Sequence, residues 1–172
     1  MKKKNVIKTR RYEPPCGTLL LGSFGDKLCL CDWQIEKHRG HVDRRLKRIL
    51  NAEFEEGTSE VIEQAVRQLD EFFAGKRKVF DMPLLFVGTD FQKKVWRELL
   101  NIPFGETISY KEMARRIGLP TAVRAVANAN GANSVSIFAP CHRVIGSDNS
   151  LTGYGGGLAA KEKLLKLEGF LY

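Results

Sequence analysis

A thiol, an imidazole and a guanidinium stand side by side at Cys141, His142 and Arg143. A free cysteine thiol has a pKa of about 8.5, so only about 3% of it is the nucleophilic thiolate at pH 7. A pKa lowered by about two units would ionise most of the thiol. Cys141 is therefore a candidate nucleophile. The three residues alone leave open the alternative of a buried, inert Cys-His pair.

Three helices are predicted to position this segment. The capping-box patterns Thr89-x-x-Gln92 and Ser109-x-x-Glu112 predict one helix that Pro103 stops and a second that ends near residue 117. Thr121 is predicted to cap a third helix that runs through residue 132. The second and third helices, joined across a Gly-containing turn, predict a helix-turn-helix motif. Residues 135–139 then predict a short apolar strand that leads to Cys141.

The third helix consists largely of alanines, and Arg124 is its one long cation. So slender a helix can approach DNA closely. It can equally pack against neighbours in an ordinary helical domain. The pattern alone favours neither interpretation.

The N-terminal half predicts a hairpin with strands at residues 18–21 and 27–33. A basic stretch follows at residues 37–48, and then an amphipathic helix behind Thr58-Ser59-Glu60 that ends near Gly75. Residues 81–87 suit an edge strand or a connector. We predict an α+β protein with two domains: a small sheet-plus-helix domain at residues 1–87, with residues 1–11 as a basic solvated tail, and a helical domain at residues 88–172.

Composition limits the partners and the cellular compartment. Lys and Arg outnumber Asp and Glu by 28 to 20 in 172 residues, and the net charge of +8 favours a polyanionic partner. The sequence has no apolar run of membrane-spanning length, so we expect a cytoplasmic protein with no membrane partner. The four cysteines are expected to be free thiols. A zinc site made of Cys16, Cys29, Cys31 and His38 or His41 matches none of the usual spacings, so no metal is predicted.

Residues 91–169 resemble the catalytic domain of the O6-alkylguanine-DNA alkyltransferases, also called methylated-DNA--protein-cysteine methyltransferases. The motifs that agree in order and spacing are Phe104-Gly105-Glu106-Thr107-Ile108-Ser109-Tyr110, Arg124-Ala125-Val126, Asn133, Pro140-Cys141-His142-Arg143-Val144 and Gly153-Tyr154-Gly155-Gly156-Gly157-Leu158. The resemblance implies a winged-helix-like DNA-binding and catalytic domain. The N-terminal half resembles the family's variable domain only loosely.

By this resemblance Cys141 accepts the alkyl group from O6 of guanine in duplex DNA, without a cofactor, and the protein is then spent. The family's activating network implies a path from Cys141 through a water molecule to His142 and on to Glu168. Asn133 would hold the turn around the active site, and Tyr110 would assist the departing base at N3.

The same resemblance implies how the lesion is reached. Arg124 would enter the duplex and fill the space of an extruded nucleotide. Tyr154 and Gly155 would wall the base pocket, and further contacts to DNA or the base would come from Ser109, Ala125 and Arg143. Two positions depart from the family: Ser134 replaces a usual proline, which suggests a looser turn, and Gly155 replaces the serine of some relatives.

The expected partner is double-stranded DNA that contains O6-alkylguanine, bound by a monomer. Whether O4-alkylthymine is also repaired is left open. The main alternative is a non-catalytic lesion binder that recruits other repair proteins, although such proteins carry another residue where Cys141 stands. A transcription regulator would need further domains. A cysteine hydrolase would need direct contact between adjacent residues, which is awkward on a strand.

Overall fold

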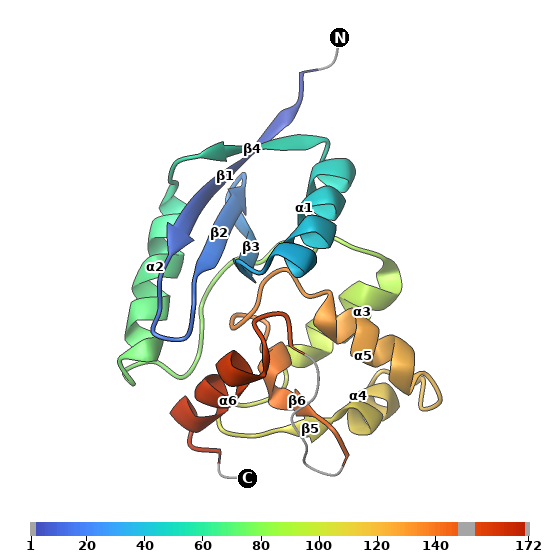
Figure 1. The fold of residues 1–172 in the computed structure, drawn as a ribbon. Coiled ribbons are helices and arrows are strands. Elements are labelled where there is room, and N and C mark those ends of the chain that lie inside the picture. Colours follow the sequence, from blue (N-terminus) through green and yellow to red (C-terminus); the bar gives the residue numbers. More distant parts are fainter. Residues whose placement is uncertain (1–2, 148–153, 171–172) are drawn as a thin grey trace.

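The computed structural model describes residues 3–147 and 154–170, without the side chains of residues 36–38. In Figure 1 a sheet with two helices forms the upper half of the molecule and several shorter helices form the lower half, as the predicted α+β class requires. The upper half comprises β1 (Asn5–Tyr12), β2 (Leu19–Phe24), β3 (Lys27–Trp33), α1 (Glu36–Leu50), β4 (Ala52–Glu56) and α2 (Glu60–Phe73). The lower half comprises α3 (Asp90–Leu99), β5 (Ile108–Ser109), α4 (Tyr110–Arg116), α5 (Val123–Gly131), β6 (Val144–Ile145) and α6 (Leu158–Leu167).

The predicted basic tail is wrong, because residues 5–12 form β1, an inner strand of the sheet. The strand order is β3-β2-β1-β4, and β1 pairs antiparallel with β2 and parallel with β4. Ile7 and Thr9 are buried, while the alternate residues Lys8 and Arg10 form ion pairs with glutamates. The charged residues made the strand hard to recognise in the sequence. They alternate with buried residues, because every second side chain of a strand points to the surface of the sheet. Lys2, also assigned to the tail, lies outside the described residues.

The sequence did not predict α1 or β4 at all. Residues 37–48 were seen only as a basic stretch, yet Val42 and Leu46 are buried on the inner side of α1. Arg39 is also nearly buried, and its Nη1 donates to Oδ2 of Asp32 at 3.1 Å. A helix that buries an arginine in this way needs its carboxylate partner from another element, which the local sequence does not reveal.

The predicted hairpin is confirmed as β2 and β3. Its register shifts near Gly22 and Ser23, so that Cys31 pairs opposite Leu21 while Cys29 has no opposite residue. Residues two apart in a regular strand share one face, but this bulge turns Cys29 and Cys31 to different faces. Cys29 packs in the core with α1, whereas Cys31 packs in the core with α2 and the lower half.

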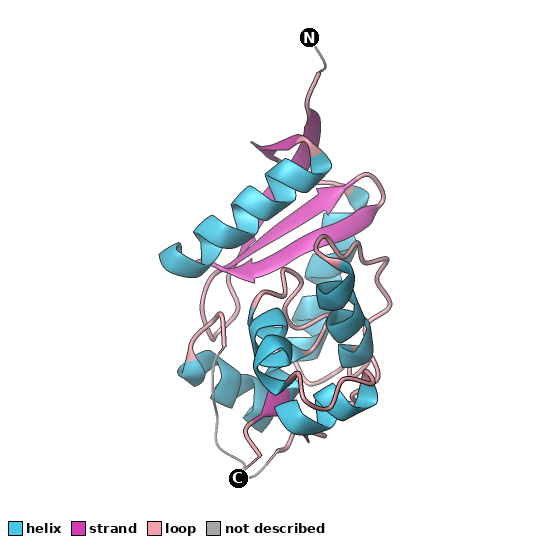
Figure 2. Ribbon diagram, turned by 90° about the vertical axis from the view of Figure 1, so that its right-hand side faces the viewer, coloured by secondary structure: helices cyan, strands magenta, loops and turns pink. Residues whose placement is uncertain are grey.

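The two long helices cover opposite faces of the sheet. α2 starts at the predicted place, because Ser59 accepts a hydrogen bond from the amide of Ile62 at 3.2 Å, and it packs on Leu19 and Leu21. α1 packs on the other face with Ile7 and Leu30 of the neighbouring strands. In Figure 2 α1 crosses in front of the strands, and the shorter helices lie below them.

Residues 74–89 connect the two halves. Their backbone touches the start of β3, where Leu28 donates to the carbonyl of Pro83 and accepts from the amide of Leu85, both at 2.8 Å. Of the two predicted possibilities, this single bridge fits the connector better than an edge strand. The core continues across it, since Leu19 and Phe72 belong to the same buried cluster as Trp96 and Cys141.

The lower half confirms the predicted helices with one correction at a cap. Thr89 and Gln92 form both bonds of a capping box on α3, and Ser109 caps α4. α5 packs against α4 across a turn in which Gly118 has φ 79°, as expected for a helix-turn-helix. Thr121 is not the cap of α5: the amide of Ala122 donates to the carbonyl of residue 119, and this turn delays the helix start to residue 123.

Residues 135–139 form a tight turn and not the predicted strand. The amide of Ala139 donates to the carbonyl of Val135 at 2.9 Å, and Ile137 adopts φ 75°. A β-branched residue rarely takes this left-handed conformation, so the surrounding contacts must hold it there. The turn presents Cys141 at the start of a short 3₁₀ helix, Cys141–Arg143.

Two general findings concern membranes and metals. None of the described helices combines the length and the apolar character that crossing a membrane requires. Within residues 3–147 and 154–170, no three His, Cys, Asp or Glu side chains gather as a metal ion would need. The side chain of His38, part of the zinc alternative, lies outside the described part of the chain.

Candidate active site

Cys141 lies at the lower edge of the shared core, with only 4% of its surface exposed. Its Sγ is 4.0 Å from the hydroxyl of Ser136. Burial raises the pKa of the Cys141 thiol, although hydrogen bonds from Asn133 and Ser136 and the charge of Lys161 oppose the increase. The site therefore does not hold a ready thiolate, the possibility that the sequence raised. The thiol must give up its proton during the reaction.

His142 provides a base next to the thiol in sequence and is fully buried. Its Nε2 lies 2.7 Å from Oε2 of Glu168. Burial lowers the pKa of His142, against the opposing influence of the carboxylate, so the ring is neutral at pH 7. A neutral ring that donates Nε2–H to the carboxylate carries its lone pair on Nδ1. Nδ1 is buried and has no hydrogen-bond partner among the described residues, so it can accept a proton.

Glu168 is held by more than the histidine. Nε of Arg143 donates to its Oε1 at 2.8 Å, Nη2 of Arg143 donates to its Oε2 at 2.9 Å, and the amide of Gly105 donates to Oε1 at 3.3 Å. Burial raises the pKa of Glu168, but the hydrogen bonds from His142 and Arg143 and the charge of the guanidinium outweigh it and lower the pKa to about 2. The carboxylate is thus ionised and fixed in orientation.

Arg143 is the one predicted DNA contact that the structure turns inward. It is 6% exposed, and besides its two bonds to Glu168 it donates from Nη1 to the carbonyl of Ile102 at 2.6 Å. A guanidinium with its fork on a buried carboxylate is not free to bind a phosphate. The hydrogen bonds of Arg143 thus hold Glu168 in place, and its contact with DNA stays a prediction that this geometry does not favour.

Asn133 holds the turn before the nucleophile from both sides, as the resemblance implied. Its Nδ2 donates to the carbonyl of Ala139 at 2.8 Å, and its Oδ1 accepts from the amide of Val135 at 3.0 Å. From α5, Nδ2 of Asn130 donates to the carbonyl of Cys141 at 3.3 Å. Two buried amide side chains therefore fix the backbone that carries the thiol.

Ser134, which replaces the family's usual proline, ties the turn to the sheet. Its hydroxyl donates to the carbonyl of Cys29 at 3.1 Å, and its own carbonyl accepts from the amide of Cys31 at 2.8 Å. The expected loosening is therefore offset by the hydroxyl bond, which a proline cannot make, whereas the backbone carbonyl could accept from Cys31 in either case. The turn is attached to β3 directly.

Lys161 is a residue of the site that sequence reasoning missed. Its side chain is fully buried, its Nζ donates to the carbonyl of Val144 at 2.7 Å, and Nζ lies 5.8 Å from the ring centroid of Tyr110. Burial lowers the pKa of Lys161 to about 8, partly opposed by Cys141. The signal was the seven-residue spacing to Glu168, which puts both on one face of the last helix.

Tyr110 and Ser109 are placed by a two-residue parallel ladder. β5 pairs Ile108 with Val144 and Ser109 with Ile145, which brings the start of α4 beside the segment that follows Cys141. Oγ of Ser109 accepts from the amide of residue 112 at 2.9 Å, so this hydroxyl serves the helix start. Tyr110 is half-buried at the first position of the helix.

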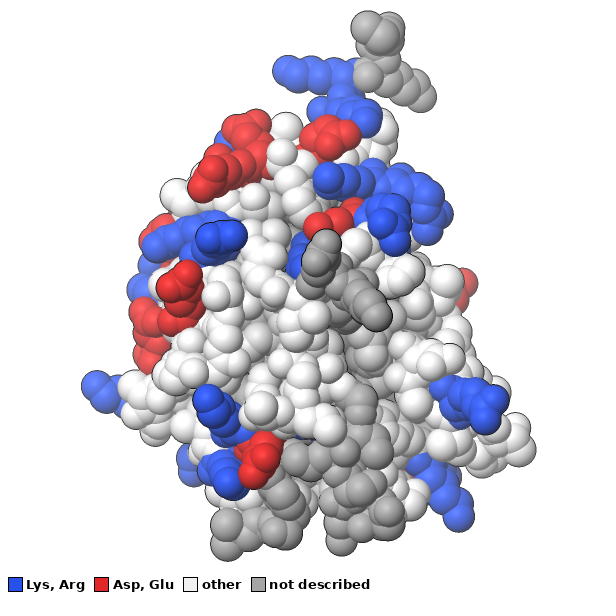
Figure 3. Space-filling view, viewed as in Figure 1, with Lys and Arg blue, Asp and Glu red and all other residues white. Residues whose placement is uncertain are grey.

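Arg124 and Ala125 lie on the exposed side of α5, whereas Val126, Ala129 and Asn130 are buried on its inner side. The outer side of α5 thus carries the predicted DNA contacts, and its inner side carries Asn130, whose amide bonds the backbone of Cys141. In Figure 3 the lower right, where Figure 1 places α4 and α5, shows basic side chains and no acidic ones on the viewed face. That surface suits a polyanion.

Tyr154 stands against the sheet, with its ring centroid 5.9 Å from that of Trp33 in an edge-on arrangement. Gly155 is half-buried beside it. At Gly156 a Cβ would lie 2.6 Å from the indole of Trp33, so only glycine fits there. Gly153 of the predicted motif lies outside the described residues.

The arrangement has known counterparts. Residues 7–86 match the family described as 6-O-methylguanine DNA methyltransferase, ribonuclease-like domain, and residues 90–170 match its DNA binding domain. A methylated-DNA--protein-cysteine methyltransferase of Methanosarcina barkeri is 46% identical over 91% of this chain and 93% of its own.

Among solved structures, the crystal structure of Mycobacterium tuberculosis O6-methylguanine methyltransferase is similar, with a TM-score of 0.78 and 43% identity over 94% of this chain and 92% of that one. A crystal structure of Mycobacterium tuberculosis OGT in complex with DNA has a TM-score of 0.78 and 42% identity, over 95% of this chain and 92% of that one.

Proposed function

Because the chain belongs to the 6-O-methylguanine DNA methyltransferase family, we propose that it repairs DNA by moving an alkyl group from O6 of guanine to Sγ of Cys141. The observation that carries the proposal is that buried Cys141 is followed by buried His142, whose Nε2 faces the ionised carboxylate of Glu168 and whose Nδ1 has no partner among the described residues; these are the parts of a proton relay. The same relay opposes the inert Cys-His pair, because an inert thiol needs no oriented base.

The transfer is a single displacement. The proton of the Cys141 thiol passes through a bridging water to Nδ1 of His142, and the resulting imidazolium is stabilised by Glu168. Sγ then attacks the alkyl carbon in line, so that the S–C bond forms as the C–O6 bond breaks. The guanine leaves with the bonding electrons and takes a proton at N3, which Tyr110 supplies. Cys141 ends as a thioether, and each molecule reacts once.

Access to the lesion requires extrusion of its nucleotide from the duplex. Arg124 is exposed on α5 and can occupy the vacated position. Tyr154 and Gly155 would line the pocket that receives the base, with backbone N–H groups available to O6 as negative charge develops there. Ala125 and Ser109 would lie along the bound strand.

The partner in this proposal is double-stranded DNA that contains O6-alkylguanine, bound by one copy of the protein. Transfer from O4-alkylthymine needs the same displacement, and we include it as a second substrate to be tested. A nucleophilic thiol also needs a reducing compartment, which supports a cytoplasmic location. The four cysteines are unpaired in the structure.

The proposal is tested by mass spectrometry of the protein after reaction with an oligonucleotide duplex that contains O6-methylguanine. We expect one added methyl group per molecule, on the peptide that carries Cys141. Cys141→Ser should abolish transfer while DNA binding stays near normal. Cys16→Ser, which changes the half-buried thiol on the sheet side, is the matched control and should transfer normally.

Transfer by Cys141→Ser at the normal rate would reject Cys141 as the acceptor. A wild-type protein that binds the lesion but stays unmodified would instead favour the recruiting role. Parallel duplexes with O4-methylthymine and with unmodified bases decide the substrate range.

A further inference from the structure

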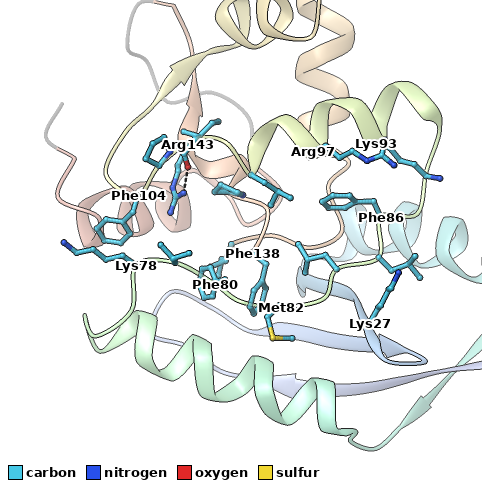
Figure 4. Close-up of a pocket in the computed structure, with 18 residues that line it drawn as sticks. Lys27, Lys78, Phe80, Met82, Phe86, Lys93, Arg97, Phe104, Phe138 and Arg143 are labelled. Carbon is cyan, nitrogen blue, oxygen red and sulfur yellow. Dashed lines mark hydrogen bonds between the residues drawn. The ribbon is translucent and has the colours of Figure 1, made fainter.

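A cavity of about 660 Å³ opens between the two halves of the protein (Figure 4). Its walls come from the start of β3, the connector between α2 and α3, the end of α3 with residues 100–104, and the turn that leads to Cys141. Its size lies within the range of pockets that hold a single small ligand, about 300–1,000 Å³.

The floor of the cavity is aromatic. The ring centroids of Phe80 and Phe138 are 4.6 Å apart, and Phe80 also lies 5.2 Å from Phe72 of the core. Figure 4 shows Phe80 and Phe138 in the middle of the site, with Phe86 and Phe104 towards its two ends. These rings offer an apolar body a large contact area at a fixed position.

The rim of the cavity is basic. Lys78 lies at one end, and Lys27, Lys93 and Arg97 lie at the other (Figure 4). Of the described residues that line the cavity, none is acidic, and these four cations form no ion pair with any residue in the described part of the chain. Nζ of Lys78 lies 5.5 Å from the ring centroid of Phe104.

We propose that this cavity binds a small amphipathic anion, with its apolar body on the phenylalanine floor and its negative group among the rim cations. The uncompensated positive charge over an aromatic surface is the observation that selects this class of ligand. A neutral apolar ligand would leave the cations without a partner, and an inorganic anion would leave the floor exposed to water.

The cavity is separate from the predicted DNA surface. None of its described lining residues belongs to α4, α5 or α6. It shares with the active site the turn around the nucleophile, through Ile137, Phe138, Pro140 and Arg143, and also Ile102, whose carbonyl accepts from Arg143. An anion and a DNA duplex should therefore bind at the same time.

Two fluorescent probes that differ only in charge test the proposal. Anilinonaphthalene sulfonate carries an apolar double ring and one sulfonate, whereas N-phenylnaphthylamine lacks the sulfonate. The native full-length protein should bind the sulfonate with one-to-one stoichiometry and about tenfold more tightly than the neutral probe. A saturating undamaged DNA duplex should not displace it.

Charge reversal on α3 locates the site. Lys93→Glu and Arg97→Glu should each weaken binding of the sulfonate by about tenfold and change binding of the neutral probe by less than about twofold. Lys94→Glu makes the same charge change one residue away, on an exposed side chain outside the cavity, and should bind both probes normally. Thermal unfolding of each variant shows that it is folded.

Equal loss in Lys94→Glu and Lys93→Glu would overturn the proposal, because the effect would then be one of net charge. Failure of the sulfonate to saturate the protein would overturn it as well. Displacement of the bound sulfonate by a short single strand of thymidine nucleotides would also overturn it. The cavity would then be a site for nucleic acid, whose bases stack on aromatic rings as well.

Discussion

Glu168 sets the direction in which the imidazole of His142 can accept a proton. Its carboxylate is held by the Nε and Nη2 edge of the Arg143 guanidinium and by the amide of Gly105, so it holds Nε2–H of the ring in one orientation. A buried base without such a partner could rotate or change tautomer. In the proposed reaction, the orientation of the base next to Cys141 therefore depends on Arg143, whose guanidinium bonds Glu168 and the carbonyl of Ile102.

Removal of the Glu168 charge should change how stability depends on pH. The pKa of Glu168 is about 2 in the folded protein, below its ordinary 4.5, so its contribution is complete above pH 4.5 and is lost as the pH falls through 2. Urea unfolding from pH 5 down to pH 2 should show the wild type losing up to about 3 kcal/mol relative to Glu168→Gln.

Glu106→Gln, at an exposed glutamate, controls for the loss of one carboxylate in that comparison. A difference between wild type and Glu168→Gln that is the same at every pH would contradict the assigned pKa. It would mean that the carboxylate gains nothing from its partners on folding.

Lys161→Met should slow alkyl transfer to free O6-benzylguanine at pH 7 on the order of tenfold. The charge of Lys161 lowers the pKa of the Cys141 thiol, so its loss should move the alkaline rise of the rate constant to higher pH. The rate constant measured from pH 6 to 10 tests this. Lys163→Met, on the exposed side of the same helix, should keep the wild-type pH profile. A wild-type profile for Lys161→Met as well would exclude the electrostatic role of Lys161.

At the level of elements, α5 carries both a predicted DNA contact and a residue that bonds the backbone of Cys141. Arg124 projects from its outer side, while Asn130 on its inner side bonds the backbone of Cys141. Movement of this helix on a duplex would therefore reach the nucleophile through one hydrogen bond. The alanines between the two residues keep the helix thin enough to lie close to DNA.

Arg124→Ala should reduce repair of a duplex by at least about tenfold and change the reaction with free O6-benzylguanine by less than about twofold. The arginine matters only where a nucleotide must leave a stacked duplex. Single-turnover rates on both substrates give the comparison, with Arg48→Ala on α1 as a control for the loss of one exposed cation. Losses of equal size on both substrates would remove Arg124 from the extrusion step.

The elements that were predictable from sequence are those with local signals. Thr89, Ser59 and Ser109 mark helix starts because a cap is a contact between residues three apart. The sequence analysis did not predict β1 and α1, because their buried residues lie between many charged residues. The partners of these charges come from distant segments. The turn at Ile137 was not predicted either, because a short run of apolar residues is compatible with a strand as well as with a strained turn.

The site was predictable to the extent that its residues match motifs of a family. Cys141, His142, Glu168 and Asn133 do meet in the structure, and their roles remain predictions. The inward direction of Arg143 follows from how α6 packs on the turn, which no local pattern encodes, and the burial of Lys161 could be inferred only once Glu168 had been placed in the site. Long cationic side chains near a functional motif can serve either DNA or a carboxylate.

The larger of two buried clusters spans both halves of the molecule, since Trp33 and Cys31 of the sheet lie in the same cluster as Trp96 and Cys141, while a second cluster lies between the sheet and α1. β3 bonds directly to the turn before the nucleophile, through Ser134 and Ser136. The N-terminal half is therefore structural support for the active site, even though its own residues do no chemistry in the proposed reaction.

Deletion of residues 1–12 should abolish folding, because it removes an inner strand that buries Ile7 and Thr9. The lost pairing on both sides of β1 exceeds what a net stability of about 5–15 kcal/mol can tolerate. Deletion of residues 1–3 alone should leave the melting temperature within a few degrees. Calorimetry of both proteins checks this; a cooperative transition after the longer deletion would restore the tail interpretation.

The place of β1 in the sheet also determines the order in which a newly made chain can fold. β1 leaves the ribosome first and can pair with β2 almost at once, but its other edge stays open until β4 has been made, a whole helix later. The sheet face around Cys31 waits longer still, because its partner Val135 comes more than a hundred residues afterwards. A nascent chain thus carries an open strand edge until β4 has been made, and an incompletely covered apolar face for most of its synthesis, the interval in which it is most exposed to aggregation and most in need of a chaperone.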